Sequence, residues 1–259
     1  MIKTYTNYIK ALDNMKKYPK ELYTLGDVTL LERPKVSIVG TRKPSIYTQD
    51  QTKTLASALA KRGVCLVSGA AMGVDALVHQ GAGLNNTIAV VANSLDIRYP
   101  SINRHMIEGI EKEGLVISQF PVSTKAAPWS FVVRNELVVA LGDILIVTEA
   151  DVNSGSMRSV EFALKMGKEI YVLAQRLGES NATNQLLEDG LAQPIYNIET
   201  FANKYGIVPT SEVVSKDDFF YFCQTSPTFD DAVAQFNDRV YEAELEGLIY
   251  IENGLVRLV

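Results

Sequence analysis

Short apolar runs that alternate with longer helical segments constrain the fold of this chain more than any other feature. The runs cover residues 35–40, 64–68, 87–91, 115–118, 143–150 and 169–174. A segment with helical spacing of apolar residues follows each of them, over 48–62, 74–83, 103–113, 130–141, 156–167 and 182–190. The runs lack polar alternation, as do strands that are covered on both faces. This order predicts an α/β protein with a parallel sheet and helices on both faces.

The two ends of the chain differ from this repeating middle. Residues 1–33 are interpreted as an N-terminal lead-in that packs on the core domain, residues 34–206. Residues 207–215 are predicted to be a linker. Short helices and a β-hairpin are expected over 216–259, because Asn253–Gly254 between two apolar runs is a strong hairpin signal. This order indicates a small winged-helix-like C-terminal domain.

Composition limits the expected location, metals and partners. Of the 259 residues, 47% are hydrophobic, and no apolar run reaches the roughly 18–20 residues that span a bilayer. The chain opens without a signal-peptide pattern, so a cytoplasmic protein with no membrane contact is expected. Cys65 and Cys223 have neither disulfide nor zinc spacing, so we expect no metal and no cofactor. The net charge of −5 disfavours a broadly basic surface but allows a local basic pocket.

Three of the expected strand-to-helix turns contain glycine. They lie at 40–44, 68–73 and 153–157, and all three fall at the carboxyl ends of strands, where parallel sheets bind ligands. Free N–H groups at helix N-termini form an anion-binding rim there. Arg42 adds a guanidinium that can hold a phosphate with two hydrogen bonds. A single turn of this kind would reflect tight geometry alone, but three turns and an arginine predict a phosphate site.

The segment APWSFVVRNELVVALGD (127–143) places aromatic, basic and amide side chains at a helix start. Trp129 or Phe131 can stack on a base, Arg134 can hold a phosphate, and Asn135 can contact a base edge. The alternative is that Phe131 belongs to the core and Trp129 covers it.

Familiar enzyme motifs do not fit the sequence. VGTRKPSIY is not a G-x-G-x-x-G turn, and neither G-x-x-x-x-G-K-[ST] nor G-x-S-x-G occurs. Asp75, two residues after Gly73, is interpreted as an acceptor for N–H groups at a helix start rather than as a catalytic carboxylate.

Together these segments resemble the DNA-processing protein A family, DprA, also called Smf. The resemblance covers roughly residues 18–200 and rests on the collinear motifs SIVGTRKPSIY, VSGAAMGVDALVHQGA, IRYPSINRHMI, FVVRNELVVALGDILIVTEADVNSGS and NQLLEDGLA. It implies an extended Rossmann-like domain that binds single-stranded DNA without strong sequence preference. It further implies a homodimer that helps to load the RecA recombinase on incoming DNA in natural transformation, with no enzyme activity.

The resemblance also assigns the binding residues. Arg42 would hold phosphate, the small residues of the turns would form pocket walls and donate N–H groups, and Phe131 would stand where a base enters. The residues expected to contact DNA are Gly40, Thr41, Arg42, Lys43, Ser68, Gly69, Gly73, Lys125, Phe131, Arg134, Asn135, Ser154, Gly155 and Ser156.

The sequence departs from the family pattern at several of these places. Glu136 stands where members usually have arginine, and a carboxylate there should weaken phosphate binding unless it points away. Gln175 and Arg176 replace a common proline-glycine turn. Trp129 lies where a basic residue would help to hold DNA, and Lys125 is expected to take over that role.

Two alternatives remain open from the sequence. A nucleoside-monophosphate phosphoribohydrolase-like enzyme would use a P-G-G-x-G-T-x-x-E turn, to which NSGSMRSVE (153–161) offers Gly155, Ser156 and Glu161 but not the double glycine or the glutamate spacing. Glu161 is therefore interpreted as a solvated helix residue. An interaction scaffold is the other alternative, since the tail segment DDAVAQFNDRVYEAELEGL is acidic, with Arg239 as its only basic residue, and predicts a protein contact.

Overall fold

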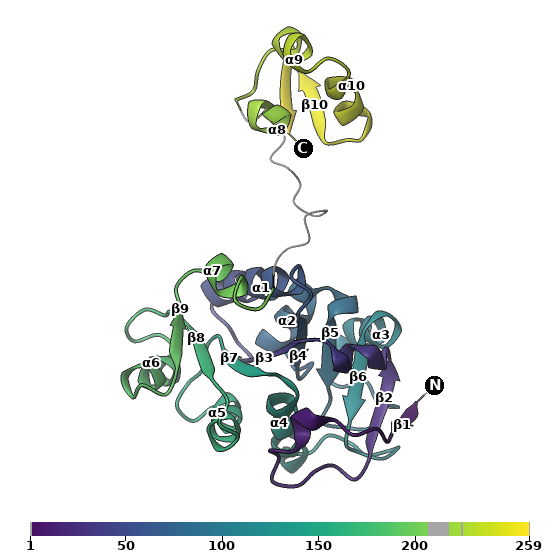
Figure 1. Cartoon of the computed structure of the whole chain (residues 1–259), viewed down its shortest axis with the longest axis vertical. Helices are drawn as coiled ribbons and strands as arrows, with labels where there is room; N and C mark the ends of the chain where they lie inside the picture. The colour runs from purple at the N-terminus through teal and green to yellow at the C-terminus, as the bar shows by residue number, and fades with distance from the viewer. Residues whose placement is uncertain (1, 207–217, 224, 259) are drawn as a thin grey trace. The chain divides into compact units, whose positions relative to one another are not determined.

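A mostly parallel sheet with helices on both faces forms the larger part of the protein (Figure 1). The structure, a computed structural model, describes residues 2–206, 218–223 and 225–258. Within these residues the strands of this sheet lie in the order β1-β2-β6-β5-β4-β3-β7-β8-β9. Their bounds are Lys3–Tyr5 (β1), Leu22–Gly26 (β2), Lys35–Val39 (β3), Cys65–Ser68 (β4), Thr87–Val90 (β5), Leu115–Ser118 (β6), Ile144–Val147 (β7), Ile170–Leu173 (β8) and Gln193–Ile195 (β9).

The predicted alternation of strand and helix is confirmed. The helices of this part are Ile46–Ala60 (α1), Val74–Ala82 (α2), Arg104–Glu113 (α3), Pro128–Leu141 (α4), Gly155–Lys165 (α5), Asn181–Glu188 (α6) and Ile198–Ala202 (α7), with short 3-10 helices at Lys10–Leu12, Val28–Glu32, Leu84–Asn86 and Ser101–Asn103. Apolar residues of α1, α2 and α7 pack with Ile38 and Leu66 on one face of the sheet. Those of α4, α5 and α6 pack with Cys65 and Val67 on the other face, so the central strands are buried on both sides.

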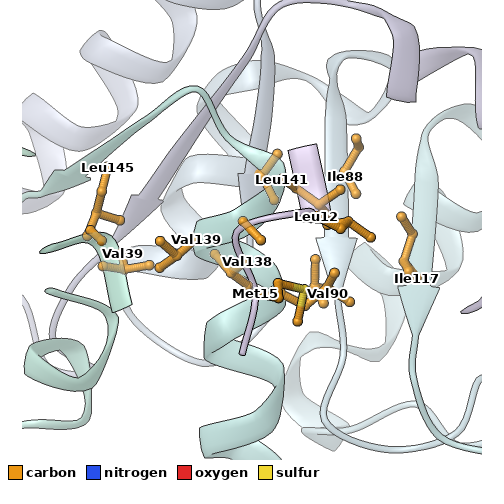
Figure 2. Close-up of a cluster of buried hydrophobic side chains, with 14 of the residues drawn as sticks. Leu12, Met15, Val39, Ile88, Val90, Ile117, Val138, Val139, Leu141 and Leu145 are labelled. Carbon is orange, nitrogen blue, oxygen red and sulfur yellow. The ribbon is translucent and has the colours of Figure 1, made fainter. Parts of the chain in front are cut away.

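The N-terminal segment completes the sheet rather than merely packing on it. Strand β2 pairs antiparallel with β6, with Thr24 opposite Ile117, and β1 pairs antiparallel with β2. Between these strands Leu12 and Met15 are buried beside α4 (Figure 2). The sequence indicated docking but not strand pairing, because β2 alternates buried and half-exposed residues over only five positions.

The C-terminal part is a separate compact unit, since the chain divides into Met1–Ile207 and Val208–Val259. Its elements are Asp218–Cys223 (α8), Phe229–Phe236 (α9), Asp238–Leu245 (α10), Ile249–Glu252 (β10) and Leu255–Leu258 (β11). The predicted hairpin is confirmed: Asn253 and Gly254 have φ of 54° and 76°, as a tight hairpin turn requires. The predicted linker 207–215 lies outside the described residues.

The structure also bears on membranes and metals. In the part of the chain that the structure describes, no helix combines the length and the apolar character needed to cross a membrane. Among the same residues, no group of three or more His, Cys, Asp or Glu side chains is placed to hold a metal ion.

His79 gives the core a pH-sensitive group. Its Nδ1 lies 2.6 Å from Thr87 Oγ1, whose own proton goes to the Leu66 carbonyl, so Nδ1 must carry the imidazole proton. The other ring nitrogen, Nε2, is buried without a hydrogen-bond partner. Burial lowers the pKa of His79 from 6.5 to about 4; the nearby Asp75 opposes this shift and Arg134 adds to it.

We expect the free energy of unfolding to fall as pH decreases from 6.5 to about 4. In this window the unfolded chain binds a proton that folded His79 excludes, and the total loss is roughly 3 kcal/mol. Denaturant titrations at several pH values measure it. His79→Gln should flatten the dependence, whereas His105→Gln, at a side chain 98% exposed, should leave it unchanged. Equal slopes for wild type and His79→Gln would contradict the assignment.

Candidate functional site

A pocket of about 400 Å³ opens at the carboxyl edge of the sheet, beside β3 and β7. The chain proceeds from β3 through β4 and β5 to β6 in one direction and then returns to β7 on the other side of β3. Loops diverge at such a switch point and leave a crevice for ligands. The lining residues come from the end of β3, from the turns after β3, β4 and β7, and from α2, α4 and α5: Val39, Gly40, Thr41, Arg42, Ala71, Met72, Asp75, Phe131, Arg134, Asn135, Ser154, Gly155, Ser156 and Ser159.

Backbone contacts hold the turn after β3 in place. The Thr41 N–H donates to the Glu149 carbonyl at 2.8 Å, and the Thr41 carbonyl accepts from the Val74 N–H at 3.1 Å. Gly73, with φ of 77°, has no Cβ that would collide with the backbone of Thr41 and Arg42. The start of α2 therefore docks on this turn and positions Arg42, whose side chain is exposed, at the pocket.

Arg134 places a buried positive charge in the same pocket. Its side chain is 6% exposed, and its Nη1 donates to Asp75 Oδ2 at 3.4 Å. Gly69 leaves the space for this side chain, because a Cβ at that position would overlap the guanidinium. Burial lowers the pKa of Arg134, but an arginine remains charged at neutral pH. Nε is buried without a hydrogen-bond partner, so one donor of this guanidinium is unsatisfied in the structure.

Phe131 is a wall of the pocket and lies close to two guanidinium groups. The centre of its ring lies 5.4 Å from Arg42 Cζ and 5.9 Å from Arg134 Cζ, within the range of cation–π attraction. Tyr99 approaches from the loop after β5, with ring centres 6.2 Å apart. A smaller hollow of about 30 Å³ adjoins the pocket along Arg42, Phe131 and Arg134 and reaches Tyr99. Phe131 is half-buried and stands outside the buried hydrophobic clusters of the described chain.

The turn after β7 contributes hydrogen-bonding groups. Helix α5 begins at Gly155, so the N–H groups of Gly155 and Ser156 belong to a first turn without intrahelical acceptors. Asn135 Nδ2 donates to the Gly155 carbonyl at 3.3 Å and ties this turn to α4. The Ser154 hydroxyl is buried and lacks a hydrogen-bond partner. Residues with amide, hydroxyl and guanidinium groups therefore line one cavity beside an aromatic ring, which suits a ligand that combines an anion with a planar group.

The structure brings most of the predicted contact residues together. Gly69 lines the adjoining hollow, and Gly73 supports the turn after β3. Ser68 does not line the pocket: it is fully buried, and its hydroxyl donates to the Ile38 carbonyl of β3. Lys43 and Lys125 are exposed and lie outside the lining. The predicted residues that do line the pocket are Gly40, Thr41, Arg42, Phe131, Arg134, Asn135, Ser154, Gly155 and Ser156.

Sequence reasoning missed several members of the site. The carboxylate of Asp75 accepts from the Ala71 N–H at 3.3 Å, as an acceptor role near the helix start requires. Its pairing with Arg134, 59 positions away, had no sequence signal. Tyr99 and Ser159 were also not predicted, although Tyr99 lies in the IRYPSINRHMI motif.

Two departures from the family pattern acquire a structural explanation. Glu136 Oε1 accepts a hydrogen bond from the Lys16 N–H at 2.7 Å, so this carboxylate points to the N-terminal segment and does not line the pocket. Gln175 Nε2 donates to Thr48 Oγ1 at 3.0 Å and to the Thr148 carbonyl at 2.8 Å, so it ties the end of β8 to α1 and to β7.

The fold and the pocket define a doubly wound α/β protein with a pocket of cationic and aromatic side chains at its switch point. A model of the family described as DNA recombination-mediator protein A matches residues 1–206. The chain belongs to this family, which confirms the resemblance seen in the sequence.

Relatives and solved structures agree with this membership. Protein Smf of Synechocystis is 32% identical over 211 residues, 78% of this chain and 53% of that protein. DNA processing protein DprA of Bacillus subtilis is 31% identical over 186 residues, 70% of this chain and 62% of that protein. The chain thus spans about half to three-fifths of the length of these relatives.

Among solved structures, DNA processing protein A from Helicobacter pylori, described for its unique single-stranded DNA binding mode, is 46% identical, with a TM-score of 0.77 over 78% of this chain and 94% of that chain. DprA from Streptococcus pneumoniae is 26% identical, with a TM-score of 0.74 over 80% and 75% of the two chains. These similarities confirm the expected extended Rossmann-like fold.

Proposed function

We propose that this protein binds single-stranded DNA in the pocket beside β3 and β7 and helps to load the RecA recombinase on incoming DNA in natural transformation. It acts in the cytoplasm as a binding protein and not as an enzyme. Family membership supports this function, as does 46% identity to a Helicobacter pylori protein that binds single-stranded DNA.

The placement of Phe131 within about 6 Å of the guanidiniums of both Arg42 and Arg134 carries the proposal. The guanidiniums would hold phosphates of the strand, and the ring would receive an unpaired base. Stacking on an aromatic side chain contributes about 1–3 kcal/mol per base and tolerates every base. Duplex DNA stacks its bases internally, so the arrangement favours single strands.

A homodimer is part of the proposal, because one pocket on a chain of net charge −5 offers few phosphate contacts. Two pockets on one strand raise the apparent affinity by about 10²–10⁴ when the strand spans both. The acidic C-terminal unit, for which a winged-helix-like fold is predicted, would contact protein rather than DNA.

Gel shifts with single- and double-stranded oligonucleotides at two salt concentrations test the ligand class. Arg42→Ala should weaken single-strand binding about 10- to 100-fold and reduce the salt slope by about 0.7 for each lost phosphate contact. The charge-matched control is Lys61→Ala, at the exposed end of α1 on the opposite edge of the sheet, which should leave both quantities unchanged. An unchanged slope for Arg42→Ala would contradict the role of Arg42.

The phosphoribohydrolase-like alternative receives a separate test. Glu161, the candidate glutamate of that chemistry, pairs with Arg158 at 3.0 Å on an exposed part of α5 and does not line the pocket. Incubation with AMP or CMP should therefore release no free base. Catalytic turnover of either nucleotide would contradict the binding-only proposal.

A further inference from the structure

Trp129 is a large exposed aromatic side chain that the proposed function leaves unused. It is the second residue of α4, two positions before Phe131, and is 58% exposed. Its ring meets the buried Phe120 in an edge contact, with ring centres 5.6 Å apart and planes at 80°. Phe120 thus supports Trp129 from one side and leaves a broad apolar surface in water, an arrangement that suits a binding contact.

The position of Trp129 continues the edge that carries the pocket. Arg42 follows β3, Tyr99 follows β5, and Phe120 with its partner Trp129 follows β6, so these groups succeed one another along the sheet edge. Five adjacent strands, β7 to β6, span about 19 Å at the usual strand spacing. A DNA strand covers this distance with about six nucleotides at roughly 3.4 Å each, or fewer when stretched. Lys125, exposed in the loop between β6 and α4, supplies a positive charge at this end.

We infer, on the basis of the proposed function, that Trp129 is a second base-stacking platform. An unpaired base of the DNA strand that passes Phe131 would occupy it. Trp129 carries no formal charge, so its contribution comes from stacking and leaves the count of neutralised phosphates unchanged. Its contribution depends on the presence of a base and not on which base it is.

Tryptophan fluorescence of the wild-type protein can detect a base stacked on Trp129, because Trp129 is the single tryptophan in the chain. An oligothymidylate of twelve nucleotides should quench the Trp129 fluorescence when tryptophan is excited at a wavelength that tyrosine does not absorb. An abasic strand of equal length, bound at low salt as shown by anisotropy, should leave the fluorescence unchanged. Oligothymidylate binding without quenching would overturn this inference and leave the proposed function standing. Absence of any oligonucleotide binding would instead overturn the proposed function.

Variants test how much the Trp129 ring contributes to the free energy of DNA binding. Trp129→Ala should weaken oligothymidylate binding about 5- to 150-fold with an unchanged salt slope, and Trp129→Phe should retain most of the affinity. Leu177→Ala, at a side chain 97% exposed in the loop after β8, is the control and should have no effect. Wild-type affinity of folded Trp129→Ala would overturn the inference. Loss of affinity only in step with loss of the dimer, measured by sedimentation, would also overturn it by assigning the ring to an interface between copies.

Discussion

Gly69→Ala is expected to displace Arg134 and to abolish most single-strand binding, although the substitution adds one methyl group to a residue without side-chain chemistry. The new Cβ would overlap the guanidinium of Arg134 and lie 2.6 Å from Asp75 Oδ2. The arginine must leave its site, which breaks the buried ion pair and leaves Asp75 without its partner. Such a break destabilises a protein by roughly 3–5 kcal/mol, and the loss of the cation should lower DNA affinity about 10- to 100-fold.

Denaturant unfolding and strand-binding titrations measure the two effects of Gly69→Ala. The matched control is Gly155→Ala, which adds the same methyl to the same pocket but at a position where a Cβ meets no atom within 4 Å. Its stability should stay close to that of the wild type. If Gly69→Ala unfolded at the wild-type denaturant concentration and bound the strand normally, Arg134 would not depend on the space at Gly69.

Local patterns in the sequence predicted most of the core domain. Strands such as β4 and β7 are short apolar runs buried on both faces, and each precedes a helix whose apolar residues recur at helical spacing. The hairpin at Asn253–Gly254 was equally predictable, since its turn needs two consecutive residues with positive φ. The three glycine-containing turns indicated the edge at which the pocket lies, because the carboxyl ends of parallel strands share one edge.

Contacts between distant segments could not be predicted in this way. The Glu136 side chain accepts a hydrogen bond from the Lys16 backbone across 120 positions, and this carboxylate does not line the pocket. Ser68 begins a segment of small residues that is typical of a ligand-binding turn. In the structure it is the last residue of β4, and its buried hydroxyl donates to the Ile38 carbonyl of the neighbouring strand β3. The β1–β2 extension was missed because short strands that pair at an edge lack a continuous apolar run.

Asp75→Ala is expected to destabilise the protein by roughly 3–5 kcal/mol, since it leaves the guanidinium of Arg134 buried without a counter-charge. Both side chains are mostly buried, at 10% and 6% exposure, so solvent compensates only in part for the lost carboxylate. Asp75→Asn should cost less, because an amide oxygen can still accept from the Ala71 N–H. Thermal and denaturant unfolding of the two variants measure this difference.

A double variant separates the contribution of the Asp75–Arg134 ion pair to stability from its contribution to DNA binding. Asp75→Ala combined with Arg134→Met removes both charges and fills much of the space, so stability should recover most of the loss seen with Asp75→Ala alone. Single-strand affinity should not recover, because the cation beside Phe131 is absent. Recovery of both stability and affinity would show that the buried pair only supports the fold and that Arg42 alone supplies the positive charge of the pocket.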